Sequence, residues 1–246
     1  MITFSKPCPS SAHAAYSPQE AKFRLLILPD WQGGLTSYLQ RMGNLFGEAL
    51  TAETWLFHPY AQEINPKTYE PVGRRLVADA LSDRTLCRQW MATILQDMEP
   101  HWHNSNAPLI VLGFCFGGTL AFEAARQSRL ISAAVSIHGN PATTSNLPIA
   151  NEQTAMVLVQ GGNDPLIPQQ HLDRFADEMK HSTRPWFQHT IGQARHSFTK
   201  HEVGKIGPGS VYDAHALMAS VKVLSALLPH ITTSSATCIR QGKSYA

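Results

Sequence analysis

The sequence predicts an α/β fold, in which a mostly parallel sheet is covered by helices on both faces. Apolar runs of strand length alternate with amphipathic patterns of helix length along the whole chain. The runs, of which Phe23–Leu28 is the clearest, are apolar at nearly every position, as strands buried on both faces are. At residues 113–118 one such run passes through a Gly-x-Cys-x-Gly-Gly turn directly into a helical pattern.

The first half of the chain contains two strand–helix alternations before this turn. Phe23–Leu28 is a buried strand, and the apolar spacing that follows predicts a helix over Leu39–Leu50. A short strand over Glu53–Phe57 ends at His58-Pro59, because the residue before a proline favours extended backbone. A long polar section with Pro66 and Pro71 then leads to a helix from about residue 83 to 98.

The second half repeats the alternation from the central turn onward. Beyond the strand before the turn and the helix after it, three more strands and two more helices are expected. In chain order the predicted elements are strand Leu109–Leu112, helix Thr119–Gln127, strands Ile131–Ile137 and Ala155–Gln160, helix Gln169–Lys180, strand Trp186–Thr190 and helix Asp213–Leu228.

The length indicates a single domain over residues 1–246, with an N-terminal extension of about residues 1–21 and a loose polar tail of about residues 231–246. The 43% hydrophobic and 15% charged content is that of an ordinary globule with a sizeable core. A formal net charge of +2 without basic runs argues against nucleic acid or a membrane surface as partner. The oligomeric state is left open.

The cysteines and the N-terminus favour a cytoplasmic protein. No stretch approaches the roughly 18 consecutive apolar residues of a membrane span. Residues 1–17 lack the apolar segment of a secretory signal, and Cys8, Cys87, Cys115 and Cys238 show no paired spacing. Reduced thiols in a reducing compartment are therefore expected, with Cys115 as the reactive one.

The Gly-x-Cys-x-Gly-Gly turn is the nucleophile elbow of an α/β-hydrolase, with cysteine at the usual position of serine. Such a turn holds its central residue in strained backbone and lifts that side chain above the edge of the sheet. Small neighbours are needed because the following helix packs tightly against the strand. The predicted nucleophile is Cys115.

Two further reactive residues follow predicted strands, where function gathers in parallel sheets. Asp164 comes just after Ala155–Gln160, and His196 lies in a loop after Trp186–Thr190. The chain order of nucleophile, acid and histidine is the order of this fold. His196 would promote the thiolate of Cys115, and Asp164 would fix the tautomer of the imidazole.

The remaining candidate residues near this site could have either a functional or a purely structural role. Backbone amides of Phe116 and of the loop at residues 29–34 would bind the oxyanion. His138 follows a strand, so it either lines the pocket or packs as a satisfied core histidine. The His101-Trp102-His103 segment has no further ligand at usable spacing, so no metal and no cofactor are expected.

Four segments, spread over about residues 22–229, resemble the dienelactone hydrolase family of α/β-hydrolases. They are Leu-Pro-Asp-Trp-Gln-Gly at 28–33, the cysteine elbow at 113–118, Gly-Gly-Asn-Asp-Pro-Leu-Ile-Pro at 161–168 and Arg-His-Ser-Phe at 195–198. The resemblance implies a triad of Cys115, His196 and Asp164.

The same resemblance implies further roles. A carboxylate in the first loop, here Asp30, would contact Cys115 and help to ionise it, and the amides of Trp31 and Phe116 would bind the oxyanion. Members that act on dienelactone hold the substrate carboxylate with an arginine shortly after His-Ser-Phe. Here Lys200 stands in that neighbourhood, with Arg74 and Arg75 as a possible second source of positive charge.

The expected function is hydrolysis of small-molecule esters or lactones through an acyl-thioester on Cys115, with Asp30 or His196 taking the thiol proton. One alternative is another acyl transfer on the same triad, such as a thioesterase. The other is a hydrolase-fold protein that binds a small ligand without turnover. A broad substrate panel separates the first alternative from ester or lactone hydrolysis, and a tight ligand that is recovered chemically unchanged would indicate the second.

Overall fold

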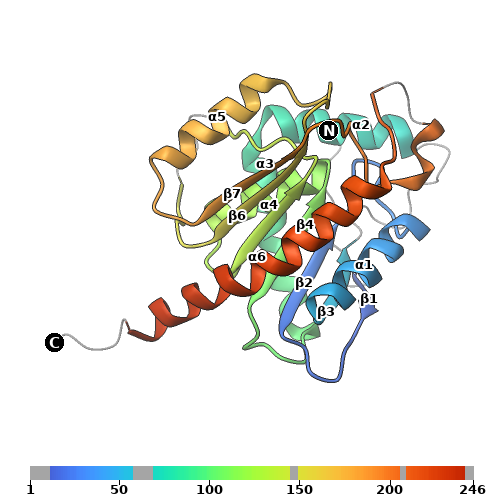
Figure 1. Ribbon diagram of the computed structural model, residues 1–246. Coiled ribbons are helices and arrows are strands. Elements are labelled where there is room, and N and C mark those ends of the chain that lie inside the picture. The colour runs from blue at the N-terminus through green and yellow to red at the C-terminus, as the bar shows by residue number, and fades with distance from the viewer. Residues whose placement is uncertain (1–11, 58–68, 145–148, 206–208, 242–246) are drawn as a thin grey trace.

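The computed structural model describes residues 12–57, 69–144, 149–205 and 209–241, which form one seven-stranded sheet (Figure 1). The strands lie in the order β1-β3-β2-β4-β5-β6-β7. Their bounds are β1 Ala12–Tyr16, β2 Phe23–Leu28, β3 Ala52–Phe57, β4 Leu109–Phe114, β5 Ala133–Ile137, β6 Ala155–Gly161 and β7 Trp186–Ile191. Only the pairing of β1 with β3 is antiparallel within this sheet, so the predicted mostly parallel sheet is confirmed.

Helices cover both faces of the sheet, as Figure 1 shows. One face carries α1 (Ser37–Leu50) and α6 (Ala214–Gln241). The other carries α3 (Arg84–Met98), α4 (Phe116–Gln127) and α5 (Gln169–Lys180), with α2 (Tyr69–Ser82) packed beside α3. Two 3₁₀ turns, η2 (Glu99–His101) and η3 (His201–Lys205), complete the described elements.

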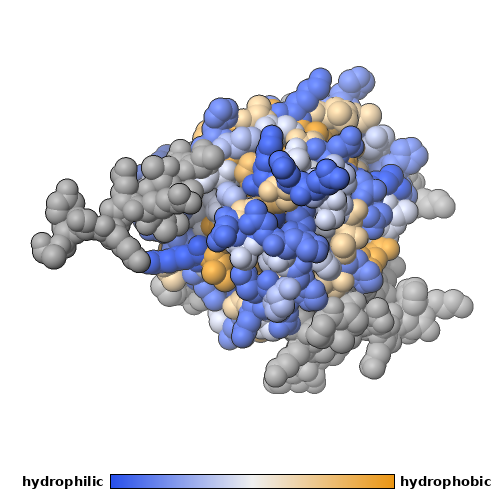
Figure 2. Space-filling view, turned by 90° about the horizontal axis from the view of Figure 1, so that it is seen from below, coloured by the Kyte–Doolittle hydropathy of each residue, from blue (hydrophilic) through white to orange (hydrophobic). Residues whose placement is uncertain are grey.

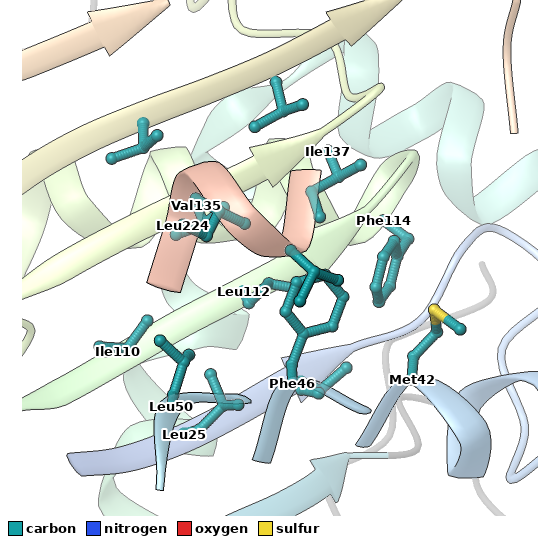
Figure 3. Packing of buried hydrophobic residues seen from close by; sticks show 14 of the residues in the cluster. Leu25, Met42, Phe46, Leu50, Ile110, Leu112, Phe114, Val135, Ile137 and Leu224 are labelled. Atoms are coloured by element: carbon teal, nitrogen blue, oxygen red, sulfur yellow. The ribbon is translucent and has the colours of Figure 1, made fainter. Parts of the chain in front are cut away.

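The alternation of side chains along each strand divides the core into two layers. In β2, Leu25 and Ile27 join the layer under α1 and α6, whereas Leu26 and Leu28 join the layer under α3 and α4. Figure 3 shows the first layer, in which Phe46 of α1 packs against Phe114 at a ring distance of 6.1 Å. The inner strands β2, β4, β5 and β6 are thus buried on both faces, which explains their continuous apolar runs, whereas the edge strands β1 and β7 are partly exposed.

Three elements differ from the sequence-based expectation. The expected N-terminal extension contributes β1, which pairs with β3. The polar section before residue 83 contains α2, in which Pro71 lies in the first turn, where no intrahelical N–H is required. The last helix runs to Gln241, through the region expected to be a loose tail, and includes Pro229. His58, Pro59 and Pro66 lie outside the described residues.

The segment Ala214–Thr232 of α6 is long and apolar enough to cross a membrane by length and composition alone. Its apolar side chains include Leu224 and Leu228, which are fully buried against the sheet. A helix that buries one stripe in a core passes the same test, so this is weak support for a span. Figure 2 shows one surface of the molecule, which is mostly hydrophilic with scattered apolar patches.

The strand order places two loops together at the carboxyl edge of the sheet. The chain goes from β2 outward to β3 and then returns to the other side of β2, where it enters β4. The crossover direction therefore reverses between β2 and β4. In open α/β sheets ligands bind at such a switch point, which here lies between the loop after Leu28 and the turn after Phe114.

Candidate active site

Cys115 occupies the single position between the end of β4 and the start of α4. Its backbone has φ 52° and ψ −115°, a strained conformation for a residue with a side chain. The surrounding structure fixes it, because its N–H donates to the carbonyl of Ile137 at 3.0 Å and its carbonyl accepts from Gly118 N–H at 3.0 Å. The thiol is held above the edge of the sheet, and Cys115 is half-buried.

The glycines of the elbow are required by close approach between backbones. A Cβ added to Gly113 would lie 2.0 Å from the carbonyl carbon of Gly117. A Cβ added to Gly117 would lie 2.5 Å from the carbonyl oxygen of Leu28, at the end of β2. The start of α4 is therefore packed tightly between β4 and the first loop, which brings that loop beside Cys115.

The three residues predicted as a triad lie in hydrogen-bonding contact. His196 Nε2 is 3.2 Å from Cys115 Sγ, and His196 Nδ1 is 2.8 Å from Asp164 Oδ2. Asp164 Oδ1 also accepts from the N–H of Leu166 at 2.8 Å. The side chains of His196 and Asp164 are almost wholly buried. This geometry matches the predicted order of nucleophile, base and orienting acid.

The loops that carry the acid and the histidine are joined to one another. Asn163 N–H donates to the carbonyl of Ala194 at 3.0 Å, and a Cβ added to Gly161 would lie 2.4 Å from that same carbonyl oxygen. His196 forms an isolated bridge with Ser210, and its carbonyl accepts from Val211 N–H at 3.1 Å. The backbone thus fixes the separation between Asp164 and the imidazole.

The charges of the site favour a protonated imidazole. Burial alone would lower the pKa of His196, but the negative charge of Cys115 and the hydrogen bond to Asp164 outweigh it and raise that pKa to about 10. A thiolate and an imidazolium are then mutually stabilising neighbours. A cysteine paired with such a cation is the reactive form of the side chain.

A cavity of about 680 Å³ opens over Cys115 and His196. Its walls are mostly apolar and come from the first loop, α2 and the loops after β6 and β7. The lining residues are Trp31, Arg74, Val77, Ala78, Leu81, Cys115, Pro165, Leu166, His196, Ser197, Gly209 and Ser210. A volume of this size accommodates a small organic substrate.

The predicted activating carboxylate, Asp30, has a different partner from the one expected. Its Oδ2 accepts from Lys200 Nζ at 2.6 Å, and its Oδ1 accepts from Gln32 N–H at 3.0 Å. Among the residues that the structure describes, no hydrogen bond joins Asp30 to Cys115. In this state the carboxylate is neutralised by a buried ion pair.

The resemblance implies that Lys200 binds a carboxylate of the substrate, but in the structure its ammonium contacts Asp30 instead. Besides Asp30, its ammonium also donates to the side-chain oxygen of Gln32 and lies 5.3 Å from the ring centre of Tyr38. The side chain is only 7% exposed, and Lys200 is not among the residues that line the cavity. Burial beside a carboxylate explains this, because a charge removed from water requires a partner.

The other residues predicted to bind the substrate or the oxyanion lie in different places. Arg74 lines the cavity, with its guanidinium 4.4 Å from the ring centre of Trp31. Arg75 is exposed and is not among the residues lining that cavity. The amide of Phe116 is at the N-terminus of α4, beside the nucleophile, and Trp31 lies in the loop after β2. Helix N-termini favour negative charge.

His138 is packed behind His196, as in the alternative of a core histidine, but its Nδ1 is buried with no hydrogen-bond partner among the described residues, so it is not fully satisfied. It is 1% exposed, and its ring lies 5.1 Å from that of His196. Its Nε2 contacts Thr199 Oγ1 at 2.9 Å, and that hydroxyl contacts Tyr38 OH at 2.7 Å. Burial, followed by the positive charge of His196, holds the pKa of His138 well below its usual range. The ring is therefore neutral.

Within the described ranges no group of three or more His, Cys, Asp and Glu side chains could hold a metal ion. In the segment considered for a metal, His101 stacks on Trp55 at 5.2 Å, and His103 Nδ1 contacts Glu53 Oε1 at 2.7 Å. Neither contact supplies a ligand set. Sequence reasoning missed Gln160, a buried polar side chain that contacts Asp164.

The fold and the nucleophile turn define the chain as an α/β-hydrolase. It belongs to the Dienelactone hydrolase family, whose sequence profile matches residues 60–231. A comparison with curated proteins found no match. Among solved structures, a dienelactone hydrolase-like promiscuous phosphotriesterase from metagenomic libraries superposes with a TM-score of 0.77 at 19% identity, covering 92% of this chain and 95% of that one.

Two further structures share the fold. A dienelactone hydrolase from Anabaena variabilis has a TM-score of 0.62 at 19% identity, covering 87% of this chain and 88% of that one. A carboxylesterase from Lactobacillus plantarum has a TM-score of 0.55 at 13% identity, covering 90% and 92%. At these identities the structural likeness establishes the fold, while the family assignment rests on the sequence match.

Proposed function

We propose that this protein hydrolyses small-molecule esters or lactones, with Cys115 as the nucleophile and an acyl-thioester as the intermediate. The observation that carries the proposal is the pair of contacts from His196, 3.2 Å to Cys115 Sγ and 2.8 Å to Asp164, at the floor of a cavity. A nucleophile, a base and an orienting acid in hydrogen-bonding contact are the requirements for acyl transfer.

In the first half of the reaction the Cys115 thiolate attacks the substrate carbonyl carbon. The developing oxyanion is placed near the amides of Phe116 and Trp31, at the N-terminus of α4 and in the first loop. When the carbon–oxygen bond breaks, His196 gives its proton to the leaving alkoxide. An alcohol is released, or a hydroxyl remains attached if the substrate is a lactone.

In the second half, water hydrolyses the thioester. The negative charge of Cys115 is a main reason for the raised pKa of His196, and acylation removes that charge. The neutral imidazole can then accept a proton from water, while Asp164 holds its other nitrogen. The acid product leaves, and the proton on His196 again faces a thiolate. The proposed steps use only side chains, backbone amides and water.

The side chains that line the cavity suggest which chemical groups the substrate carries. Its apolar walls, including Val77, Leu81 and Leu166, would bury the body of the ester. Arg74, whose guanidinium lies over the Trp31 ring, lines this cavity and is not one of the proposed reacting groups, so a carboxylate on the substrate would be placed there. We propose a cytoplasmic location, because the nucleophile must remain a reduced thiol.

The test compares wild type with Cys115→Ala on p-nitrophenyl acetate, a neutral lactone and an acyl-thioester. Loss of Cys115 is expected to lower kcat/KM for esters and lactones by about a thousandfold or more. Cys87→Ala is the matched control, because Cys87 is buried in the core and donates to the carbonyl of Ala80. Equal turnover by wild type and Cys115→Ala would overturn the proposal.

The same panel separates the acyl-transfer alternatives. Preferential turnover of the thioester would assign a thioesterase to the same residues. Trapping by mass spectrometry of an acyl group on Cys115, and its absence in Cys115→Ala, would identify the intermediate. A ligand that binds tightly and is recovered unchanged, with no turnover of any ester, would indicate a binding protein instead.

A further inference from the structure

The strand that delivers the catalytic acid carries one polar side chain. In β6 the residues Ala155 to Val159 are apolar and buried, and Gln160 follows them at 1% exposure. Four residues later the chain reaches Asp164. A fully buried amide in an otherwise apolar strand requires a hydrogen-bonding partner, because burying it without one costs free energy.

That partner is the catalytic carboxylate. Gln160 Nε2 donates to Asp164 Oδ2 at 2.9 Å, and this is the same oxygen that contacts His196 Nδ1 at 2.8 Å. The other oxygen of Asp164 accepts from Leu166 N–H at 2.8 Å. The carboxylate therefore has contacts on both oxygens, and its Oδ2 lies between an imidazole and an amide.

The orientation of the amide is fixed by this contact. Gln160 Oε1 is buried and has no hydrogen-bond partner among the described residues. Turning the amide over would place Oε1 against Asp164 Oδ2, so that two acceptors would face each other without a proton. The side chain thus leaves its own oxygen unsatisfied while its N–H group contacts the acid. A group retained at that cost is a candidate for function rather than packing.

We propose that Gln160 is a positioning residue of the catalytic triad, which orients Asp164 toward His196 and disperses the charge on Oδ2. The inference rests on the proposed function, because it assigns a role to Asp164 in that reaction. An amide does not titrate, so it donates to the carboxylate at every pH at which the enzyme works. The ionisable groups in direct contact in this network are Asp164, His196 and Cys115, His138 packs against His196, and the buried Asp30–Lys200 pair lies at the same edge of the sheet.

The first variant removes the donor and keeps the size. Gln160→Met is expected to lower kcat by about tenfold, with KM changed by less than about twofold, because a looser carboxylate misplaces the imidazole but not the substrate. Gln188→Met is the matched control, since Gln188 lies on the neighbouring strand β7 with its side chain exposed. That control should keep the wild-type kcat.

The second variant makes the donor depend on pH. In Gln160→Glu the introduced carboxyl can donate to Asp164 only while it is protonated, and burial beside a carboxylate raises its pKa. Its kcat should approach that of wild type in mildly acidic buffer and fall as the pH rises, giving a descending limb that wild type and Gln160→Met lack. The result is compared with Gln160→Met, because a side chain that only filled space at this position would leave that variant with the wild-type kcat at every pH.

A readout without substrate keeps this inference separate from the proposed function. The rate of alkylation of Cys115 by iodoacetamide is measured against pH for wild type and both Gln160 variants. The expected result is an extra pH-dependent transition in Gln160→Glu alone. If wild type turns over no ester but this transition is present, the proposed function fails and the positioning role stands. Wild-type kcat and alkylation profiles in both variants, or a loss in Gln160→Glu that does not depend on pH, would overturn the role of Gln160.

Discussion

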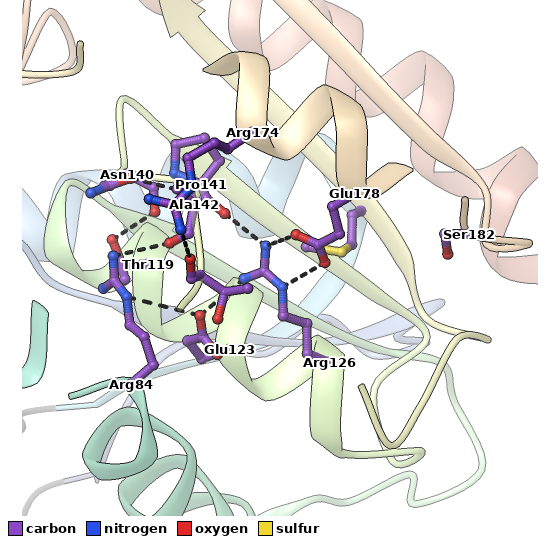
Figure 4. Close-up of polar contacts among 12 residues, drawn as sticks. Arg84, Thr119, Glu123, Arg126, Asn140, Pro141, Ala142, Arg174, Glu178 and Ser182 are labelled. Atoms are coloured by element: carbon purple, nitrogen blue, oxygen red, sulfur yellow. Dashed lines mark hydrogen bonds and ion pairs between the residues drawn. The ribbon is translucent and has the colours of Figure 1, made fainter. Parts of the chain in front are cut away.

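Two regions of this molecule contain buried charged side chains. One region is enclosed by protein on all sides, and the other faces a cavity. On the α3–α4–α5 face, Glu123 is 0% exposed and accepts from Arg88 Nε at 2.9 Å and Arg126 Nη1 at 3.1 Å. Arg126 also pairs with Glu178 at 2.6 Å (Figure 4). At the carboxyl edge of the sheet, Cys115, His196 and Asp164 form a line whose first member faces the cavity.

In the first region, backbone carbonyls of the loop after β5 cover the buried charged side chains. Four successive carbonyls after β5 each accept from a side chain on a surrounding helix. The acceptors are the carbonyls of residues 140, 141, 142 and 143, and their donors are Thr119, Arg126, Arg84 and Arg174 in that order. The cluster fixes the loop after β5 to three helices and leaves Glu123 no access to solvent.

The difference shows how the same physics supports two purposes. Burial opposes the charge on Arg126, but its carboxylate partners outweigh that effect and raise its pKa, so its state stays constant. Burial also opposes the charge on His196, yet one of the groups that raises its pKa is the Cys115 thiol, which would lose its charge by acylation in the proposed reaction. A closed cluster stabilises the fold, whereas an open one can change state during a reaction.

The largest expected effect separates the two regions by activity. His196→Asn should lower kcat/KM by about a thousandfold, because both thiolate formation and proton transfer depend on the imidazole. The effect is measured with the ester that wild type hydrolyses best, and urea denaturation serves as control. A drop of less than tenfold in a folded variant would show that another base serves Cys115.

The pH dependence sharpens the same contrast. A raised pKa means that the stabilising charge of His196 is complete below pH 6.5 and is lost as the pH rises toward about 10. Alkylation of Cys115 in wild type should therefore change as the pH rises toward about 10, and this change should be absent from His196→Asn, which has no imidazole charge to lose. Identical profiles would contradict the ion pair.

The closed cluster should respond in stability instead. Glu123→Gln leaves Arg84, Arg88 and Arg126 without their shared carboxylate, which is expected to lower the free energy of unfolding by about 3–5 kcal/mol. The kcat per folded molecule should change by less than about twofold, since the cluster lies outside the cavity. Denaturant titration and active-site titration measure the two quantities.

An exposed ion pair provides the control for that experiment. Glu202 pairs with Arg41 at 2.5 Å, and both side chains are more than 40% exposed. Glu202→Gln should cost less than about 1 kcal/mol, because water screens the pair. Equal costs for the two substitutions would mean that burial of Glu123 does not determine its contribution.

The sequence predicted the fold, and the positions of Cys115, Asp164 and His196 at one edge of the sheet, because both depend on local signals. Continuous apolar runs identify the inner parallel strands, and each of the three residues follows a predicted strand. Helix α2 was missed because Pro71 and the polar residues before it indicate a loop, although a first-turn proline is compatible with a helix. Val72, Leu76, Val77 and Ala80 do follow helical spacing, so the sequence carried a signal for this helix.

Contacts between distant segments could not be predicted in the same way. Lys200 pairs with Asp30 across 170 positions of sequence, and only the fold brings these residues together. The resemblance to the family placed both near the site, but it assigned Lys200 to the substrate and Asp30 to the thiol. Gln160 carried a usable signal, since it is the polar residue of an apolar strand just before the acid.

The smallest expected effect concerns which cation meets the substrate. Arg74 lines the cavity, whereas Lys200 is buried against Asp30. Arg74→Met should therefore raise KM about fivefold for an ester that carries a carboxylate and leave KM unchanged for a neutral ester of the same size. Lys200→Met should change kcat/KM for both esters by the same factor, because it alters the Asp30 loop and not a substrate contact. Steady-state kinetics on the matched esters measure this. If Lys200→Met selectively impaired the anionic ester, the ion pair between Lys200 and Asp30 would have to break when substrate binds. Lys200 would then contact the substrate in addition to Arg74.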